Sequence, residues 1–305
     1  MTPDLALDWR APHETDVVQT LGSLRRGPGD PAFALGPDGA VWRTTLTDAG
    51  AATLRVRQLD RDLVRVEAWG PGAEAALALA PSMLGERDDT SAFAPELPVL
   101  VDAHRRNPGL RVPRTTRVME ALVPAILEQK VISLQAHASW RRLLSRFGSA
   151  APGPTPRPMR VVPSASGWRA IPSWEWHRAG VDPRRAATVQ RVAAYAARIE
   201  EAADLPPAEA TARLMHFAGV GEWTAAEVAQ RAFGDADAVS VGDYHIANYV
   251  GHALHGRDMT DDEMLAALAP WAGQRYRVIR LLMAAGVPGR PRRGARMPFV
   301  DHRGR

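Results

Sequence analysis

The sequence predicts an α+β protein, with a small N-terminal domain built on an antiparallel β-sheet with a helix and a larger helical domain after it. Two observations support this prediction. Residues 1 to about 90 hold short, alternating, β-branched segments separated by turns rich in glycine, proline and aspartate. From about residue 94 onward, apolar residues recur at helical spacing. The predicted boundaries are 1–93 for the sheet domain, 94–288 for the helical domain and 289–305 for a basic tail.

In the N-terminal domain, three segments have the composition of strands, namely 41–47, 52–58 and 63–69. The turn-rich stretches 27–31, 36–39 and 48–50 precede or separate them. We expect an antiparallel sheet with one buried face and an amphipathic helix over 71–84 packed on it. Scaffolding is the expected role of this domain.

The helical domain shows several distinct runs. Residues 117–147 hold one or two helices, with Pro124 as a kink or a start. The proline-rich segment 152–158 is expected to be a loop. An amphipathic helix is predicted over 183–201, because Pro183 suits a first turn and the apolar residues form one stripe. Further helices are predicted over 207–217, 224–233, 243–255, 261–268 and 274–285.

The composition excludes several kinds of site. The chain has 305 residues, of which 46% are hydrophobic, so it can bury a sizeable core. It has no cysteine, which excludes disulfides, thiolate zinc sites and a cysteine-ligated iron–sulfur cluster. No apolar run of about eighteen residues and no secretory signal pattern occurs, so we expect a cytoplasmic protein without membrane contact. The sequence pattern does not bear on the oligomeric state, and a monomer is the default expectation.

The charge balance is basic, with a formal net charge of +4 and a sequence pI of about 10.0. Nearly every cation is an arginine, and Lys130 is the one lysine of the sequence. Arginine pairs well with phosphate through its planar guanidinium. This composition is compatible with DNA binding, but a GC-rich genome that favours arginine codons is the preferred explanation.

A glycine-rich turn between two helical runs is the most informative local feature. One run ends near Gly219, and the next begins after Gly221. Glycine tolerates backbone angles that other residues avoid, so the chain can turn sharply here. The free N–H groups at the start of the second helix then form a site that attracts a phosphate. About twenty residues downstream, Asp243 stands at the head of another predicted helix.

This stretch resembles the helix-hairpin-helix DNA glycosylase superfamily, and within it the AlkA-like 3-methyladenine DNA glycosylase II type. The matching pattern is an apolar residue, Gly-apolar-Gly, two variable positions and Thr-Ala, followed by the aspartate; here it runs from Phe217 to Ala225, with Asp243 downstream. The resemblance is strong over 113–254, weak in the N-terminal domain and absent from the tail. It implies a base-excision repair enzyme that flips alkylated purines, of the 3-methyladenine and 7-methylguanine type, out of duplex DNA and hydrolyses their glycosidic bond.

By this resemblance Asp243 is the catalytic residue. A carboxylate near the deoxyribose stabilises the positive charge that develops as the bond breaks, and it orients the attacking water. Aspartate is also a favoured residue at a helix N-cap, so a purely structural role is the alternative.

The resemblance also predicts the base pocket. Members that also cut the DNA backbone carry a lysine where this chain has Trp223, so a monofunctional glycosylase that leaves an abasic site is predicted. A methylated purine is cationic and is attracted by electron-rich ring faces. The predicted base-pocket residues are Trp223, Tyr244, Trp174 and Trp176, with Trp271 as a further candidate; core packing is the alternative for each.

Gly219, Gly221 and Thr224 are predicted to bind a DNA phosphate, mainly through backbone N–H groups. Gln129 and Lys130 align with a Gln-Leu pair whose leucine fills the gap left by the flipped base. Lys130 therefore departs from the family, as does Met283, near which a second pocket tryptophan is replaced.

No cofactor is expected, and no catalytic metal, because His177, His216, His245 and His252 form no helical metal pair with acidic partners. The resemblance does imply a monovalent cation, Na⁺ or K⁺, held by hairpin carbonyls. By position these are the carbonyls of Met215, Phe217 and Val220.

Three alternative functions stay open. One is a glycosylase for another lesion such as hypoxanthine. A second is a non-catalytic helix-hairpin-helix DNA-binding protein, which would have no need of a carboxylate at Asp243. A third, a structural helical protein, leaves the Gly-Val-Gly turn and its spacing to Asp243 unexplained.

Overall fold

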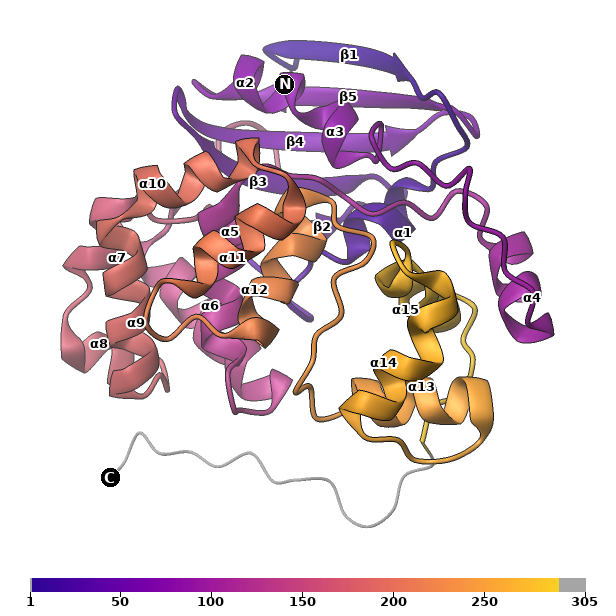
Figure 1. The fold of residues 1–305 in the computed structure, drawn as a ribbon. Coiled ribbons are helices and arrows are strands. Elements are labelled where there is room, and N and C mark those ends of the chain that lie inside the picture. The colour runs from indigo at the N-terminus through magenta and orange to yellow at the C-terminus, as the bar shows by residue number, and fades with distance from the viewer. Residues whose placement is uncertain (1, 291–305) are drawn as a thin grey trace.

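The computed structural model describes residues 2–290, and its N-terminal part is a five-stranded antiparallel sheet (Figure 1). The strand order is β1-β5-β4-β3-β2. The predicted segments 41–47, 52–58 and 63–69 correspond to the three central strands. The strands are β1 Leu5–Arg10, β2 Phe33–Leu35, β3 Val41–Thr47, β4 Gly50–Gln58 and β5 Leu63–Trp69.

One face of the sheet is fully buried, as expected, and the other is covered only in part, since it also carries the solvent-accessible ion pair of Asp8 and Arg65. Helices α1, α2 and α3 pack on the face that carries Val41, Leu54 and Val66, where alternate strand residues meet. On the other face Trp42 and Trp69 stack at 5.5 Å, and Met159 packs against them. The expected loop 152–158 therefore lies beside the sheet, between the short strands β6 (Ser149–Ala150) and β7 (Arg160–Val161).

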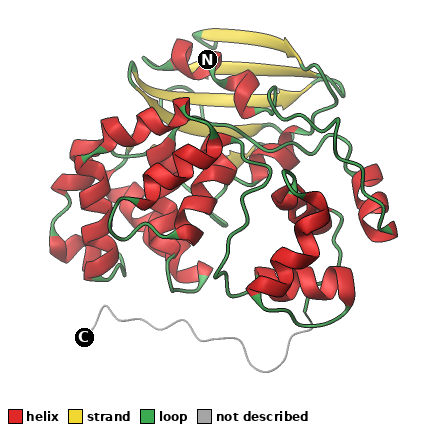
Figure 2. Cartoon of the chain, in the orientation of Figure 1, coloured by secondary structure: helices red, strands yellow, loops and turns green. Residues whose placement is uncertain are grey.

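The rest of the chain is helical, as predicted, and forms two groups of helices below the sheet (Figures 1 and 2). The bounds of the helices are α1 Val17–Gly22, α2 Ala73–Ala78, α3 Ala80–Met83, α4 Pro98–Arg106, α5 Val118–Glu128, α6 Ser133–Phe147, α7 Ala165–Ala170, α8 Ser173–Arg178, α9 Pro183–Ala194, α10 Ala196–Glu200, η1 Glu201–Asp204, α11 Pro207–Met215, α12 Glu222–Val228, η2 Ala229–Phe233, α13 Ile246–His255, α14 Asp261–Leu268, η3 Ala269–Trp271 and α15 Arg275–Ala284.

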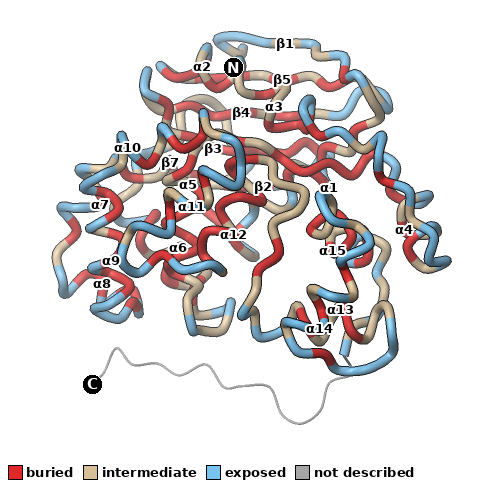
Figure 3. Tube along the Cα trace, in the orientation of Figure 1, coloured by how far each residue is buried: buried red, intermediate tan, exposed pale blue. Residues whose placement is uncertain are grey.

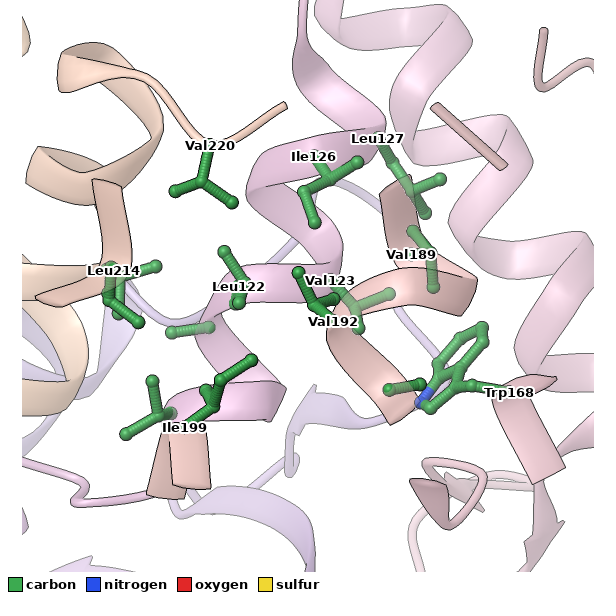
Figure 4. Close-up of a cluster of buried hydrophobic side chains, with 14 of the residues drawn as sticks. Leu122, Val123, Ile126, Leu127, Trp168, Val189, Val192, Ile199, Leu214 and Val220 are labelled. Atoms are coloured by element: carbon green, nitrogen blue, oxygen red, sulfur yellow. The ribbon is translucent and has the colours of Figure 1, made fainter. Parts of the chain in front are cut away.

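The helical part has two hydrophobic cores rather than one. The larger core is built from the helices between α5 and η2 and includes Leu122, Ile126 and Val189 (Figure 4). The smaller core joins α4 to α13, α14 and α15. Buried segments run through the centre of both groups (Figure 3). Within residues 2–290, no helix has the length and apolar character to cross a bilayer.

Several boundaries differ from the sequence predictions for local physical reasons. The helix predicted over 183–201 is interrupted at Tyr195, which leaves helical angles (φ −115°, ψ 21°) and packs its ring on Phe217. The helix predicted over 71–84 is divided at Leu79. The edge strand β1 was missed because its residues alternate only weakly between exposed and half-buried positions. The predicted tail lies outside the described residues from position 291 on.

The carboxylate of Glu120, on α5, joins the helical domain to the sheet. It accepts hydrogen bonds from Arg43 Nη2 at 2.6 Å, Thr45 Oγ1 at 2.6 Å and the backbone N of Leu46 at 2.7 Å. The Glu120 and Arg43 side chains are each 10% exposed. Removing one partner of such a buried charge pair strongly destabilises the folded protein, because the other partner stays buried and unpaired.

We predict that Glu120→Ala lowers the free energy of unfolding by about 3–5 kcal/mol, measured by urea denaturation. The matched control is Glu201→Ala, which removes an exposed glutamate paired with Arg213 and should change stability little. Equal losses in the two variants would contradict the role of Glu120 as the inter-domain contact.

Candidate active site

The hairpin between α11 and α12 has the geometry that its two glycines require. Gly219 has φ +93°, and a Cβ there would come within 2.5 Å of Thr188 Oγ1. Gly221 is the N-cap of α12, and a Cβ there would meet no atom within 4 Å. Gly219 is therefore demanded by conformation and packing, whereas Gly221 leaves the first N–H groups of α12 open to a ligand.

Side chains from two other helices hold the hairpin turn. The Gln129 amide, at the end of α5, donates to the carbonyl O of Gly219 at 2.9 Å and to Thr224 Oγ1 at 2.8 Å. Arg191 Nη1 donates to the carbonyl O of Ala218 at 2.7 Å. Gln129 was predicted to contact DNA, but here its amide binds the protein. The Thr224 side chain is buried, so a contact with phosphate would use its backbone N–H.

The Asp243 carboxylate is fixed from two sides. Its Oδ1 accepts from the backbone N of His245 at 2.8 Å and of Ile246 at 3.1 Å, in front of α13. Its Oδ2 accepts from Trp223 Nε1 at 3.0 Å. The helix begins at Ile246 rather than at Asp243, with His245 at its N-cap position, and Asp243 lies in the turn that precedes it. The structural and the catalytic interpretations of this residue are compatible, since the bonds to the start of α13 orient a half-buried carboxylate beside Trp223.

A cavity of about 1180 Å³ opens beside the hairpin. Its wall comes from the hairpin, the loop after Gly242, the turn between α5 and α6, and residues Arg25 and Arg26 of the N-terminal domain. Most of the predicted site residues line this cavity, namely Gly219, Val220, Gly221, Trp223, Thr224, Gln129, Lys130, Asp243 and Tyr244.

Two predicted base-pocket tryptophans lie elsewhere. Trp176 is 1% exposed, stacks on Trp168 at 6.1 Å and donates its Nε1–H to the carbonyl O of Ile171. It is a core residue, as the packing alternative proposed. Trp174, on the same short helix α8, is 65% exposed and does not line the cavity. Trp271 packs against the smaller helical core.

Lys130 and Tyr244 stand at the mouth of the cavity. Lys130 is exposed and adopts φ +54°, a backbone conformation that residues other than glycine rarely take. Tyr244 is 76% exposed, with its ring edge-on to His245. Met283 is 44% exposed at the end of α15 and does not line the cavity.

The cation predicted at the hairpin stays a prediction. The carbonyl O of Phe217 accepts from the backbone N of Val220 at 2.9 Å, which closes the turn that would present the ligands. Among residues 2–290, no group of three histidine or acidic side chains is placed to hold a metal ion.

The charged wall of this cavity was not predicted from the sequence. Arg26, Glu128, Glu227 and Arg231 all line it and form two ion pairs. One signal was present, because Glu227 follows Trp223 by four residues and so lies on the same helix face. No comparable signal pointed to Arg26, which arrives from a loop of the other domain.

The chain shares its fold with solved DNA glycosylases, which confirms the resemblance identified from the sequence at the level of the fold. A 3-methyladenine DNA glycosylase from Archaeoglobus fulgidus is similar with a TM-score of 0.73 and 17% identity, over 92% of this chain and 98% of that chain. An 8-oxoguanine glycosylase/lyase from Clostridium acetobutylicum gives 0.69 and 12% identity, over 93% and 100%. No protein-family model and no curated protein matches the sequence.

Because Gln129 bridges both sides of the hairpin, we predict that Gln129→Ala loosens this turn. Two hydrogen bonds are lost and the Gly219 carbonyl and Thr224 hydroxyl lose their partner, so unfolding should become easier by about 1–3 kcal/mol. Hydrogen exchange of the amides over 216–226 should accelerate. Gln190→Ala removes a glutamine amide that binds the Ile171 carbonyl, away from the hairpin, and serves as the control. Unchanged hairpin exchange in Gln129→Ala would refute the bridging role.

Proposed function

We propose that this protein is a monofunctional DNA glycosylase of base-excision repair that hydrolyses the glycosidic bond of alkylated purines, 3-methyladenine or 7-methylguanine, in duplex DNA. The observation that carries the proposal is the bond between Trp223 Nε1 and Asp243 Oδ2, at 3.0 Å, inside a cavity next to the hairpin. A protein that only grips phosphates needs neither the cavity nor this carboxylate.

The geometry suits a dissociative hydrolysis. The hairpin holds a phosphate by its open backbone N–H groups, and the flipped base enters the cavity against the Trp223 indole. Asp243 then faces the deoxyribose, where it stabilises the developing positive charge and orients a water molecule for attack. A base methylated at N3 or N7 is cationic and leaves readily, so the reaction needs no general acid.

The absence of lyase activity depends on lysine chemistry. An indole cannot form a Schiff base, so Trp223 favours hydrolysis by water. Lys130, however, lies at the mouth of the same cavity rather than remote from it. The glycosylase/lyase from Clostridium acetobutylicum shares the fold, so Lys130 has to be tested directly.

Hypoxanthine is a second candidate substrate, and one observation favours it. Only part of the cavity wall is aromatic, and its charged groups suit a base with a polar edge. A neutral base leaves less readily than a methylated one, so slower release is expected for hypoxanthine.

We predict that the wild type releases methylated purines from methylated duplex DNA and that Asp243→Asn lowers the rate by roughly a hundredfold or more. Asparagine preserves the size and the oxygen bonded to the start of α13 but loses the charge that stabilises the sugar cation. Chromatography of free bases measures the rate. Asp8→Asn removes an aspartate paired with Arg65 on the sheet and should retain full activity. Equal rates for wild type and Asp243→Asn would disprove the catalytic role.

We predict that the wild type leaves intact abasic strands that break only after alkali treatment. Borohydride, which traps a Schiff base covalently, should yield no protein–DNA adduct. An adduct that disappears in Lys130→Gln would show that Lys130 acts as a nucleophile and would overturn the monofunctional assignment while leaving the glycosylase assignment intact.

A further inference from the structure

Four charged side chains form the inner wall of the cavity, and we call them the ionic quartet: Arg26, Glu128, Glu227 and Arg231. Arg26 Nη1 lies 3.0 Å from Glu128 Oε2, and Arg231 Nη1 lies 2.8 Å from Glu227 Oε2. The four side chains are between 6% and 16% exposed. All of them line the cavity that also holds Trp223 and Asp243.

The two ion pairs act on one another. The charge of Arg231 is felt by both Arg26 and Glu128, and the charge of Glu227 is felt by Arg26. Burial raises the pKa of Glu128. The charges of Arg26 and Arg231 and a hydrogen bond from His137 lower it by more, and the net result is a pKa of about 2. Glu128 therefore stays ionised at neutral pH, and the quartet has no net charge.

A buried quartet is poorly explained by stability alone. Removing charges from water is expensive, and well-packed apolar side chains of similar volume serve stability at least as well. Among the described residues that line the cavity, aromatic rings other than histidine come only from Trp223 and Tyr244. A pocket that selects a base by ring stacking alone would need a mainly apolar wall. The wall of this cavity offers hydrogen-bonding groups instead.

The helix geometry places one ion pair where the edge of a base would lie. Trp223 and Glu227 are four residues apart on α12, so they share a face and are separated by about 6 Å along the axis. Glu227 Oε1 is oriented by Ser240 Oγ at 2.6 Å, and Arg231 Nε donates to the carbonyl O of Ser23 at 3.1 Å. Both groups are thus fixed before a base arrives, so little ordering remains to be done on binding.

We propose that Glu227 and Arg231 are specificity residues that recognise the lactam edge of a flipped 6-oxopurine. The ionised Glu227 carboxylate accepts the N1–H of the base, and Arg231 donates to its O6, as guanidinium groups do on guanine. The preferred substrates are then 7-methylguanine and hypoxanthine rather than 3-methyladenine, whose amidine edge places a donor where Arg231 needs an acceptor. This inference rests on the proposed glycosylase function.

Undamaged guanine carries the same edge, but it is protected in two ways. It is stacked and paired in the duplex, so flipping it costs more than flipping mispaired hypoxanthine. Its glycosidic bond is also stable, whereas methylation at N7 makes the base a cationic leaving group. The lactam contact therefore selects among bases that damage has already made extractable.

The test uses duplex DNA methylated with dimethyl sulfate, which contains 7-methylguanine and 3-methyladenine together. Release of each base is followed by chromatography and divided by its spontaneous depurination rate. The wild type should favour 7-methylguanine, and Glu227→Gln should reduce that preference by roughly tenfold or more, because a buried polar contact is lost for one base only. Glu67→Gln, which alters a glutamate of similar exposure paired with Arg55 on the sheet, should leave the preference unchanged.

A second measurement needs only the wild-type protein. Duplexes with hypoxanthine and with 1-methylhypoxanthine differ in the N1–H that Glu227 is proposed to accept. N1 methylation also removes base pairing, so easier flipping alone would raise the rate. The proposal expects the rate to fall by roughly tenfold or more.

The outcomes separate the two proposals. Release of 3-methyladenine at a normalised rate equal to that of 7-methylguanine overturns the lactam assignment and leaves the glycosylase assignment standing. Equal slowing of both bases in Glu227→Gln, or faster release of 1-methylhypoxanthine, does the same. Failure to release any of these bases removes the glycosylase assignment itself, and the lactam assignment with it.

Discussion

The amide of Gln129 is the contact on which the geometry of the site depends. It joins the C-terminal end of α5, a helix held in the larger core, to the Gly219 carbonyl and the Thr224 hydroxyl on both sides of the hairpin. The direction of α12 is set by this contact and by the close approach of Gly219 to Thr188. Because α12 is fixed in this way, Trp223 projects toward Asp243 instead of into the core. One neutral side chain therefore couples the packing of the helical domain to the position of the candidate catalytic carboxylate.

The cavity has two electrostatically different regions, one with exposed cations and one with buried ion pairs. Arg25 and Lys130 are exposed cations that line the cavity, and under the proposed function they would attract the DNA backbone through an interaction that salt screens. The inner wall carries charges that are paired and largely shielded from solvent, where interactions are stronger and directional. A neutral, fully bonded wall avoids the penalty that an unpaired buried charge would impose. It still presents oriented acceptors and donors to a molecule that enters, and this combination is what selectivity by hydrogen bonding requires.

Sequence reasoning succeeded where a local pattern determines structure. The alternating strands 41–47 and 63–69, the helices of the second domain and the hairpin were all visible, because periodicity and glycine placement act over a few residues. Asp243 and Trp223 were singled out through the family resemblance, and the structure places them in hydrogen-bond contact. Contacts that depend on the tertiary fold were not predicted from the sequence. Trp174 and Trp176 have the composition of a pocket but lie on the surface and in the core. Arg26 reaches the cavity across more than a hundred residues of chain from Glu128, and no local pattern announces such a contact.

The position of Arg26 also changes the expected role of the N-terminal domain. That domain was expected to act as a scaffold, and Glu120 does bind it firmly to α5 through Arg43. Its loop near Gly27, however, enters the cavity wall, and Gly27 has φ +72° with no room for a Cβ beside the His137 ring. His137 in turn lies 3.5 Å from Glu128. A purely structural domain would not need to extend beyond the sheet. This loop does so, and it places the Arg26 guanidinium against the Glu128 carboxylate of the helical domain. The cavity is therefore a joint product of both domains, and its chemistry depends on their being held together.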